Sequence, residues 1–528
     1  MEAESNVEER WDMNQRLIFW ACFVAIAATA AVFVVRGQVI GAWATEFGLT
    51  ETQKGEILGV GLWPFAVTIV LFSLVVDRIG YGKSLVFAFI CHVVSTVVLI
   101  MANGYWSLYI GTLIVSLGNG AAQAVADPVV ASMCTRDKTK WLNVLHASWP
   151  LGMVAGGIAG IQISGLDWRW RIAMLLVPMA MYGLMMLGRK FPVHERVAAG
   201  VSYKEMLRET GALGMLLVLW LMFGEVGRVF GWHWSVAAGL AIGLSTGYGL
   251  YARSLGQPVF LLLLAIMIPL ATTELGTDSW ITSLMEMPMR ELALNAGWVL
   301  VYTSFIMMIL RFCAGPVVKA LSPLGLLLAS SLIATLGLVA LSFSTGIMIL
   351  LAATLYGVGK TYLWPTMLGI VAERFPKGGA LSLNVTSAVG MMSVGVIGTV
   401  FLGRVQDHAV ETHLEREQPA LHQKVVTEKD SVLGSYLAVN PKKVEGLAEA
   451  DRQAIAGLSA KANKSALATT AILPAIMFIG YLGLVFYFRR KGGYKAVQLT
   501  AEEPARRAPP PEVARSTKDR DKKLVRES

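Results

Sequence analysis

Charge is scarce in this chain. Asp, Glu, Lys and Arg make up 15% of its 528 residues, whereas 55% are hydrophobic. Soluble proteins carry about 25% charged residues, so the composition excludes an ordinary soluble domain and indicates a membrane protein. The short alternating strands of a membrane barrel are also lacking, and we therefore expect an all-α polytopic fold.

Cysteines and nucleotide-binding motifs are scarce as well. The four cysteines lie in or beside apolar segments without paired spacing, so we interpret them as packing residues: Cys22, Cys91, Cys134 and Cys313. No Walker loop, Rossmann glycine pattern, zinc spacing or nucleophile elbow occurs on a soluble segment. The sequence thus predicts no enzyme activity, no cofactor and no metal site.

Long apolar windows recur along nearly the whole chain, each close to the length of about 20 residues that a membrane-spanning helix needs. We count fourteen such windows, at residues 17–38, 56–76, 84–102, 106–130, 144–164, 171–188, 212–231, 234–252, 258–281, 295–317, 325–345, 347–371, 380–402 and 466–488. The first window is of full length and follows an acidic, polar segment, so we expect no cleaved signal peptide.

If the fourteen windows cross the membrane in turn, both chain ends lie on the same side. Lys and Arg concentrate in the loops on that side. Because cytoplasmic loops are enriched in basic residues, the bias predicts a cell-membrane protein with both termini in the cytoplasm. The net charge of +9 then reflects topology and contact with anionic lipid headgroups, and it requires no nucleic-acid partner. We expect a monomer in the bilayer.

The windows divide into two sets of six with two additional helices between them. The expected parts are a cytoplasmic N-terminus (1–16), a first six-helix bundle (17–188), a basic cytoplasmic loop with two extra helices (189–257), a second bundle (258–488) and a disordered basic cytoplasmic tail (489–528). The second bundle includes an extracytoplasmic loop at 407–465, which we expect to be partly helical and amphipathic.

The two sets of six also resemble each other. Pro128, followed by Gly152 in the first set, corresponds to Pro365, followed by Gly390 in the second. Weak duplication of a multi-helix unit is typical of transporters, whose substrate site lies between the repeats near the middle of the membrane.

The connection "VVDRIGYGKS" places charges between two apolar windows. Its glycines permit a tight turn, and Asp77 at the end of a helix is expected to pair with Arg78, Lys83 or the N-terminus of another helix. An ordinary basic cytoplasmic loop is the alternative interpretation.

At this point the sequence resembles the major facilitator superfamily. The stretch "SLVVDRIGYGK" is similar to the signature between that superfamily's second and third helices, with Ser73 in place of the usual first glycine. The segments "DWRWR" and "RFCAGPVVK", the latter starting at Arg311, are also similar to the superfamily. The resemblance implies a bundle of six plus six helices and gating roles for Asp77, Arg78, Lys83 and Arg311.

Within the superfamily, the stretches "AVADPVV", "WLNVLHASWPLG", "YLWPTMLGIVAERF" and "NVTSAVG" resemble the fucose-galactose-glucose:proton symporter branch. That branch keeps carboxylates in its first and fourth helices. Here Arg36 falls at the first place and Gln123 near the second, with Asp127 one turn later. The resemblance implies transport of a small polar solute, with proton coupling open.

Ionisable groups at membrane depth are costly, at least about 2.5 to 3.5 kcal/mol each, and are functional by default. The candidates for substrate binding or coupling are Arg36, Asp127, His146, Glu274, Asp278 and Lys360. We expect Glu274 to pair with Lys360, and a purely structural charge network is the alternative. Gln123 and Asn384 complete the polar candidates, and Trp149, Tyr362 and Trp364 are candidates for stacking on a sugar ring.

These observations predict a secondary active transporter of a small polar solute, most simply a sugar or a sugar derivative. An organic anion transporter or exchanger is the alternative that Arg36, Lys360 and His146 favour. A membrane sensor that keeps the fold without transporting is an alternative of another class, with the loop 407–465 as its receptor surface.

Overall fold

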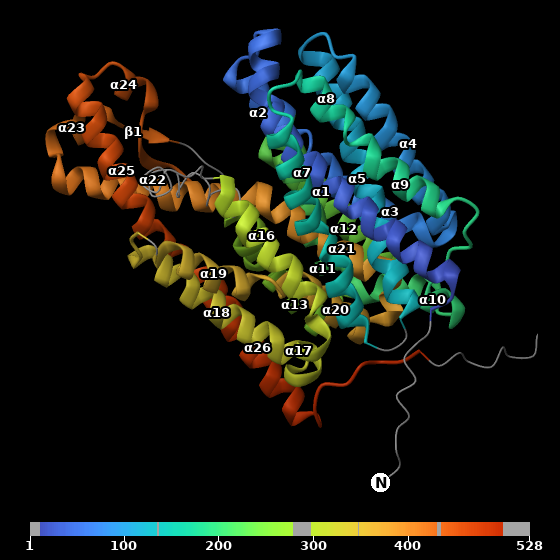
Figure 1. The fold of residues 1–528 in the computed structure, drawn as a ribbon. Coiled ribbons are helices and arrows are strands. Elements are labelled where there is room, and N and C mark those ends of the chain that lie inside the picture. Colours follow the sequence, from blue (N-terminus) through green and yellow to red (C-terminus); the bar gives the residue numbers. More distant parts are fainter. Residues whose placement is uncertain (1–10, 135–136, 278–296, 347, 430–433, 500–528) are drawn as a thin grey trace, which may run out of the picture.

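The computed structural model describes residues 11–134, 137–277, 297–346, 348–429 and 434–499. The described chain is almost entirely helical (Figure 1). Helix starts follow local rules, since Asp12, Thr50 and Ser202 each form a capping box with the residue three positions later. Proline opens other helices, where its missing amide costs nothing.

The first half of the chain forms one bundle. Its helices are α1 (Met13–Phe47), α2 (Glu51–Gly59), α3 (Trp63–Ile79), α4 (Tyr81–Ile100), α5 (Tyr105–Met133), α6 (Lys138–His146), α7 (Ser148–Gln162), α8 (Trp168–Ala173) and α9 (Leu176–Met186). Helix α1 packs against α7 and α9, and α5 packs against α3 and α4. Glycine makes the closest approach possible, because a β-carbon at Gly152 of α7 would overlap the backbone of Ala27 in α1.

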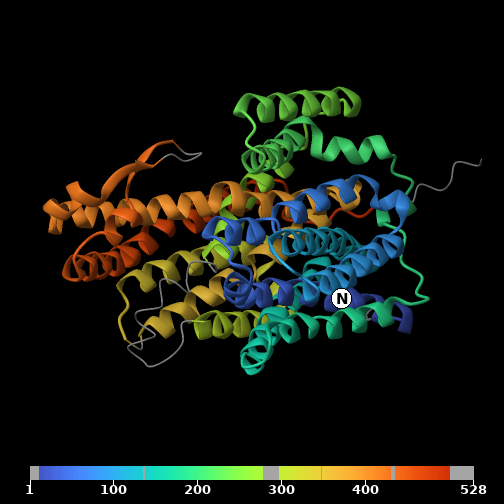
Figure 2. The same ribbon diagram turned by 90° about the horizontal axis from the view of Figure 1, so that it is seen from above.

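Two further long helices follow the first bundle. After the short α10 (Glu195–Ala198) come α11 (Tyr203–Val229) and α12 (Trp234–Ala252). Helix α11 bends at Gly211, whose φ of 61° suits glycine and whose backbone lies against Gly256. It packs against α3 and α21, and α12 packs against α11 at the edge of the molecule (Figure 2, green).

The second half forms the other bundle. Its elements are α13 (Pro258–Ala271), the π-helix η1 (Thr272–Gly276), α16 (Gly297–Phe312), α17 (Ala314–Leu321), α18 (Pro323–Phe343), α19 (Met348–Lys360), α20 (Leu363–Arg374), the 3-10 turn η2 (Pro376–Gly378), α21 (Gly379–Ser393), the π-helix η3 (Val394–Gly398), α22 (Thr399–Glu417) and α26 (Ile472–Arg490). The halves meet where α21 packs on α3 and α5, α20 on α6, and α16 on α7.

A small lobe projects from the second bundle (Figures 1 and 2, orange to red). It contains the end of α22, α23 (Pro419–Val425), β1 (Val426–Lys429), β2 (Tyr436–Val439), α24 (Pro441–Glu445) and α25 (Glu449–Thr470). The two strands pair antiparallel with Val426 opposite Val439. The lobe has its own apolar core of Leu414, Leu421, Val425, Ile455 and Leu458. The prediction of partly helical structure in 407–465 is confirmed, but the sequence analysis missed the hairpin.

The count of fourteen spanning helices is not confirmed. Ten helices in the described chain are long and apolar enough to cross a membrane, and an eleventh span consists of α16 and α17, which meet at a 67° bend. The windows at 171–188 and 347–371 are each divided between two short helices, α8 with α9 and α19 with α20. The window at 234–252 is the continuous helix α12, which is not among these candidates.

Both ends of the described chain lie at the same end of the molecule, together with α10 and α17 (Figure 1). Helices α2 and α8 lie at the opposite end. The first residues after α26 do not match the expected disordered tail, because they bind the end of α20. Arg374 donates to the carbonyl of Lys495, and the amide of Val497 donates to the carbonyl of Glu373.

Candidate functional site

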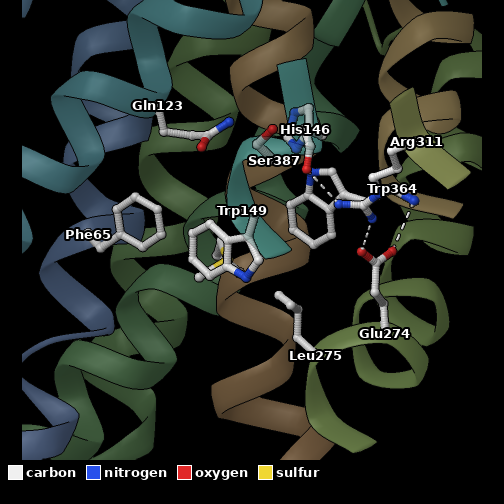
Figure 3. A pocket seen from close by; sticks show the side chains of 10 residues that line it. Phe65, Gln123, His146, Trp149, Glu274, Leu275, Arg311, Trp364 and Ser387 are labelled. Atoms are coloured by element: carbon white, nitrogen blue, oxygen red, sulfur yellow. Dashed lines mark hydrogen bonds and ion pairs between the residues drawn. The ribbon is translucent and has the colours of Figure 1, made fainter. Parts of the chain in front are cut away.

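A small pocket lies between the two bundles, and both bundles line it (Figure 3). The first bundle contributes Phe65, Gln123, His146 and Trp149, and the second contributes Glu274, Leu275, Arg311, Trp364, Ser387 and Met391. Five residues proposed from the sequence for binding or coupling therefore share this pocket: Gln123, His146, Trp149, Glu274 and Trp364. The walls are aromatic, and the polar groups come from opposite sides.

Asp127 lies directly behind this pocket, fully buried in α5. One of its carboxylate oxygens contacts His146 Nε2 at 2.9 Å, and the other accepts from Gln123 Nε2 at 2.6 Å. Ser387, from the second bundle, donates to the same oxygen at 3.5 Å. Gln123 and Asp127 are four residues apart on one helix face, so α5 itself brings them together. The carboxylate therefore joins both bundles through His146 and Ser387.

Glu274 and Arg311 form a buried ion pair on the other side of the pocket. Arg311 Nη2 lies 2.6 Å from Glu274 Oε1, and both side chains are at most 5% exposed. The second oxygen of Glu274 accepts from the amide of Trp364 in the first turn of α20. Glu274 belongs to η1, whose wider turn is a frequent feature of functional sites. The expected pairing of Glu274 with Lys360 is therefore wrong, because Arg311 occupies that carboxylate.

Lys360 is also buried, with its ammonium 5.5 Å from the ring centroid of Tyr356. Asp278 lies outside the described residues.

Tyr362 points away from the pocket, since its hydroxyl donates to the carbonyl of Leu310 and its ring packs with Leu326. Asn384 of the second bundle does not line the pocket, but its side-chain amide donates a hydrogen bond to the carbonyl of Ala124 in the first bundle.

Helix α6 belongs to the first bundle, but both of its ends are held by the second. At its start, the amide and hydroxyl of Thr139 donate to the carboxylate of Glu373 at 3.2 and 2.5 Å. At its end, Arg311 Nη1 donates to the carbonyl of His146 at 2.9 Å. An anion at the N-terminus and a cation at the C-terminus both suit the helix dipole. The second oxygen of Glu373 accepts from the hydroxyl of Tyr494, in the segment after α26.

Arg36 lies in α1 beside the aromatic wall of the pocket. It is 4% exposed, and its Nε and Nη1 have no hydrogen-bond partner. The guanidinium lies 5.2 Å from the ring centroid of Phe33, and a β-carbon at Gly61 would overlap it. Phe33 in turn contacts two lining residues, with centroids 5.6 Å from Trp149 and 6.2 Å from Phe65.

The turn after α3 makes a different ion pair from the expected ones. Asp77 accepts from Arg196 Nη2 at 2.7 Å and from the hydroxyl of Tyr81 at 3.0 Å. Arg78 instead stacks on Tyr203, 4.2 Å from the ring centroid, and Lys83 is exposed. Arg311, the fourth residue for which the resemblance implied a gating role, lines the pocket. The sequence analysis did not identify Arg196 as the partner of Asp77. The only indication in the sequence was that Arg196 lies in the basic stretch after the first bundle.

The Asp77–Arg196 pair is buried between the bundles, with both side chains 6% exposed. The side chain of Arg196 also lies against Gly379 at the start of α21 in the second bundle. Next to it, His194 caps α10 by accepting from the amide of Arg196. Burial lowers the pKa of His194 to about 4, which keeps the imidazole neutral at physiological pH.

The family follows from comparison with known proteins. The model of the Major Facilitator Superfamily matches residues 18–399. The chain belongs to this superfamily. Its members are transporters, and the mostly helical fold in two halves agrees with that architecture.

Solved structures share the fold at low identity. The fucose:proton symporter of E. coli superposes with a TM-score of 0.57 over 89% of this chain and 98% of its own, at 13% identity. The proton:xylose symporter XylE reaches 0.59 over 89% and 96%, also at 13% identity. The human organic anion transporter MFSD10 reaches 0.56 over 89% and 100%, at 12% identity. At these identities the superpositions establish the fold alone.

Curated relatives match over shorter segments. MFS transporter L2 of Phoma sp. is 26% identical over 204 residues, 38% of this chain and 31% of its own length. The D-xylose transporter of Levilactobacillus brevis is 23% identical over 160 residues, 30% of this chain and 33% of its own. The chain thus spans about a third of the length of either relative.

In the part of the chain that the structure describes, no group of His, Cys, Asp and Glu side chains has the arrangement of a metal site. None of the four cysteines forms a disulfide within the described residues, and three of them are buried. The pocket residues that the sequence analysis did not include are Phe65, Leu275, Ser387 and Met391. Ser387 carried a signal in "NVTSAVG", whereas the apolar lining residues looked like any other lipid-facing or core position.

Proposed function

We propose that this protein is a secondary active transporter that moves a small polar solute across the membrane by alternating access. The observation that carries this proposal is the pocket that both bundles line. A solute bound there contacts both halves, so its binding energy can favour one arrangement of the halves over another.

The contacts between the bundles support this mechanism. The start of α6, the Asp77–Arg196 pair and the contact of Arg196 with Gly379 bring the halves together at the end where both termini lie. On the basic-residue bias, this end is cytoplasmic. The described arrangement is then closed to the cytoplasm, and these contacts separate when the transporter opens inward.

The favoured solute is a sugar or a sugar derivative. Trp149, Trp364 and Phe65 offer apolar faces on which a sugar ring can stack, and Gln123 and Ser387 offer groups that bond hydroxyls. The fucose:proton and proton:xylose symporters share the fold. A proton is the proposed coupling ion, with Asp127 as its site because this carboxylate is fully buried and already contacts His146.

An organic anion transporter or exchanger is the second candidate. Arg36 favours it, because a buried cation without a hydrogen-bond partner attracts an anion. A sensor that binds a solute without moving it would use the projecting lobe as its receptor surface. We further propose a monomer in the cell membrane with both termini in the cytoplasm.

Uptake into proteoliposomes tests the proposal. Purified protein should accumulate a labelled sugar or sugar acid, and the internal label should exchange with unlabelled solute. Binding without flux would contradict transport and favour the sensor. In a cysteine-free background, a cysteine in the lobe at Ser465 should react with an impermeant maleimide added outside cells, whereas one at Ser516 should not. The reverse pattern would overturn the orientation.

A further inference from the structure

The guanidinium of Arg36 is the least satisfied buried cation in the described chain. Arg171 and Arg374 also have a buried Nε without a partner, but their other nitrogens donate to backbone carbonyls. Arg311, which is equally buried, donates to Thr361, His146 and Glu274. Arg36 forms none of the hydrogen bonds or ion pairs found in the described residues, although it is 4% exposed.

Such a cation is expensive to bury. An ion removed from water loses several kcal/mol of effective solvation, on the order of the whole stability of a domain, unless an opposite charge or hydrogen bonds replace the water. The aromatic face of Phe33 compensates only part of this loss. The other buried ions of the pocket have partners, since Glu274 is held by Arg311, and Asp127 by His146 and Gln123.

The position of Arg36 connects it with the solute pocket. The residue one turn earlier, Phe33, contacts the guanidinium and also contacts Trp149 and Phe65 of the pocket. Arg36 thus lies one aromatic ring away from the pocket. Gly61 provides its space, because a side chain at that position would overlap the guanidinium. An acidic group on a pocket-bound solute is therefore within reach of a long, flexible side chain.

We propose that the transported solute carries a carboxylate, that Arg36 binds this carboxylate, and that the remainder of the solute is a hydroxylated chain or ring. This inference rests on the proposed transport function and narrows its substrate class to sugar acids. Arginine suits a carboxylate because its planar guanidinium offers several fixed donors. Trp149, Trp364 and Gln123 then hold the hydroxylated part, as in the site described above.

Binding of matched solutes to purified full-length protein tests the inference. D-Gluconate and D-glucuronate should bind the wild type at least tenfold more tightly than D-glucose, measured by thermal shift and by isothermal titration. Arg36→Met should reduce this preference to about twofold or less. Arg36→Lys, which keeps the charge and loses the planar donors, should fall between the two. The control Arg228→Met, at an exposed arginine of α11 that does not line the solute pocket, should leave the preference unchanged.

The unliganded protein provides an independent readout. Because Arg36 has no partner to lose, Arg36→Met should have an equal or higher melting temperature than the wild type without solute, whereas loss of a structural arginine would lower it. Equal affinity of the wild type for glucose and gluconate would overturn the inference, even if glucose is transported and the proposed function stands. Competition by chloride or phosphate at the same concentrations as gluconate would assign the site to an inorganic anion and would also overturn it.

Discussion

Arg311 of the second bundle donates a hydrogen bond of 2.9 Å to the backbone carbonyl of His146 in the first. The same guanidinium pairs with Glu274, and the side chain of the same histidine contacts Asp127. The two buried carboxylates of the pocket are therefore linked through one contact between the halves. In the proposed alternating-access mechanism, a change of charge at either carboxylate would act on the end of α6, the helix that separates from the second bundle when the halves rearrange.

The Glu274–Arg311 pair should show strong coupling. Removing one partner leaves the other charge buried and unpaired, at a cost of about 3 to 5 kcal/mol. We expect Glu274→Gln and Arg311→Met each to lower the melting temperature and to reduce uptake strongly. The double variant should be more stable than the sum of the two losses implies, by about 1 to 3 kcal/mol. Additive losses in thermal unfolding would show that the pair is not coupled.

Asp127 should carry the proton coupling. Asp127→Asn keeps the size of the side chain and the acceptor for Gln123, but it removes the charge that contacts His146. We expect uptake driven by an imposed pH gradient to be abolished, while counterflow exchange in the same proteoliposomes persists. Glu225→Gln, which removes a carboxylate of α11 that pairs with Arg228 and does not line the solute pocket, should leave both activities intact. Accumulation by Asp127→Asn on a proton gradient would exclude Asp127 as the coupling site.

Asp77 and Arg196 should act as a cytoplasmic lock. Asp77→Asn weakens a buried ion pair next to Gly379 of the second bundle, so the inward-open arrangement becomes more populated. We expect slower uptake with solute affinity within a few fold of the wild type, and faster labelling of a cysteine placed at Ser382. Lys83→Gln, at an exposed position of the same turn, serves as the control. Unchanged uptake and labelling in Asp77→Asn would contradict the gating role and favour the interpretation of this turn as an ordinary basic cytoplasmic loop.

Glu373 should stabilise the closed arrangement through the dipole of α6. Glu373→Gln keeps an acceptor for Thr139 and removes the negative charge at the helix start. Charges at helix ends contribute about 0.3 to 1 kcal/mol, so we expect a shift of about two- to fivefold toward the inward-open arrangement. Labelling of the cysteine at Ser382 measures it. Tyr494→Phe removes one further bond to the same carboxylate and should shift the equilibrium in the same direction by less.

His194 should make stability depend on pH. Its pKa is lowered to about 4 by burial, whereas in the unfolded chain it is near the ordinary value of 6.5. Between these values the unfolded state binds a proton that the native state does not. The free energy of unfolding therefore falls as the pH drops from about 6.5 to 4, by up to about 1.4 kcal/mol per unit, and this contribution is constant above that window.

The matched control for this prediction is another histidine that caps a helix in the same way. His194 and the exposed His233 each accept from the backbone amide two residues later. His194→Asn keeps a capping acceptor and should flatten the pH dependence of the melting temperature between pH 7 and 4.5. His233→Asn should not change it. Equal slopes in the wild type and His194→Asn would show that the imidazole does not titrate differently on folding.

The sequence alone determined the membrane character and the family, because apolar length and short motifs are local properties. It also located Asp127, His146 and Glu274, since an ionisable residue inside an apolar window is visible without any structure. Only the tertiary structure decided which charges meet. Arg311, and not Lys360, pairs with Glu274, Arg196 pairs with Asp77, and Tyr362 faces away from the pocket.

The physical reason lies in the solvent of a membrane helix. A helix in water shows which face is buried through the period of its apolar residues, but a helix in lipid is apolar on nearly all faces. Its rotation is set by close packing at small residues, such as Gly152 on α1, and by bends such as η1 and the break between α16 and α17. These features arise from contacts between distant segments, so the partners of the buried charges became known only from the folded chain.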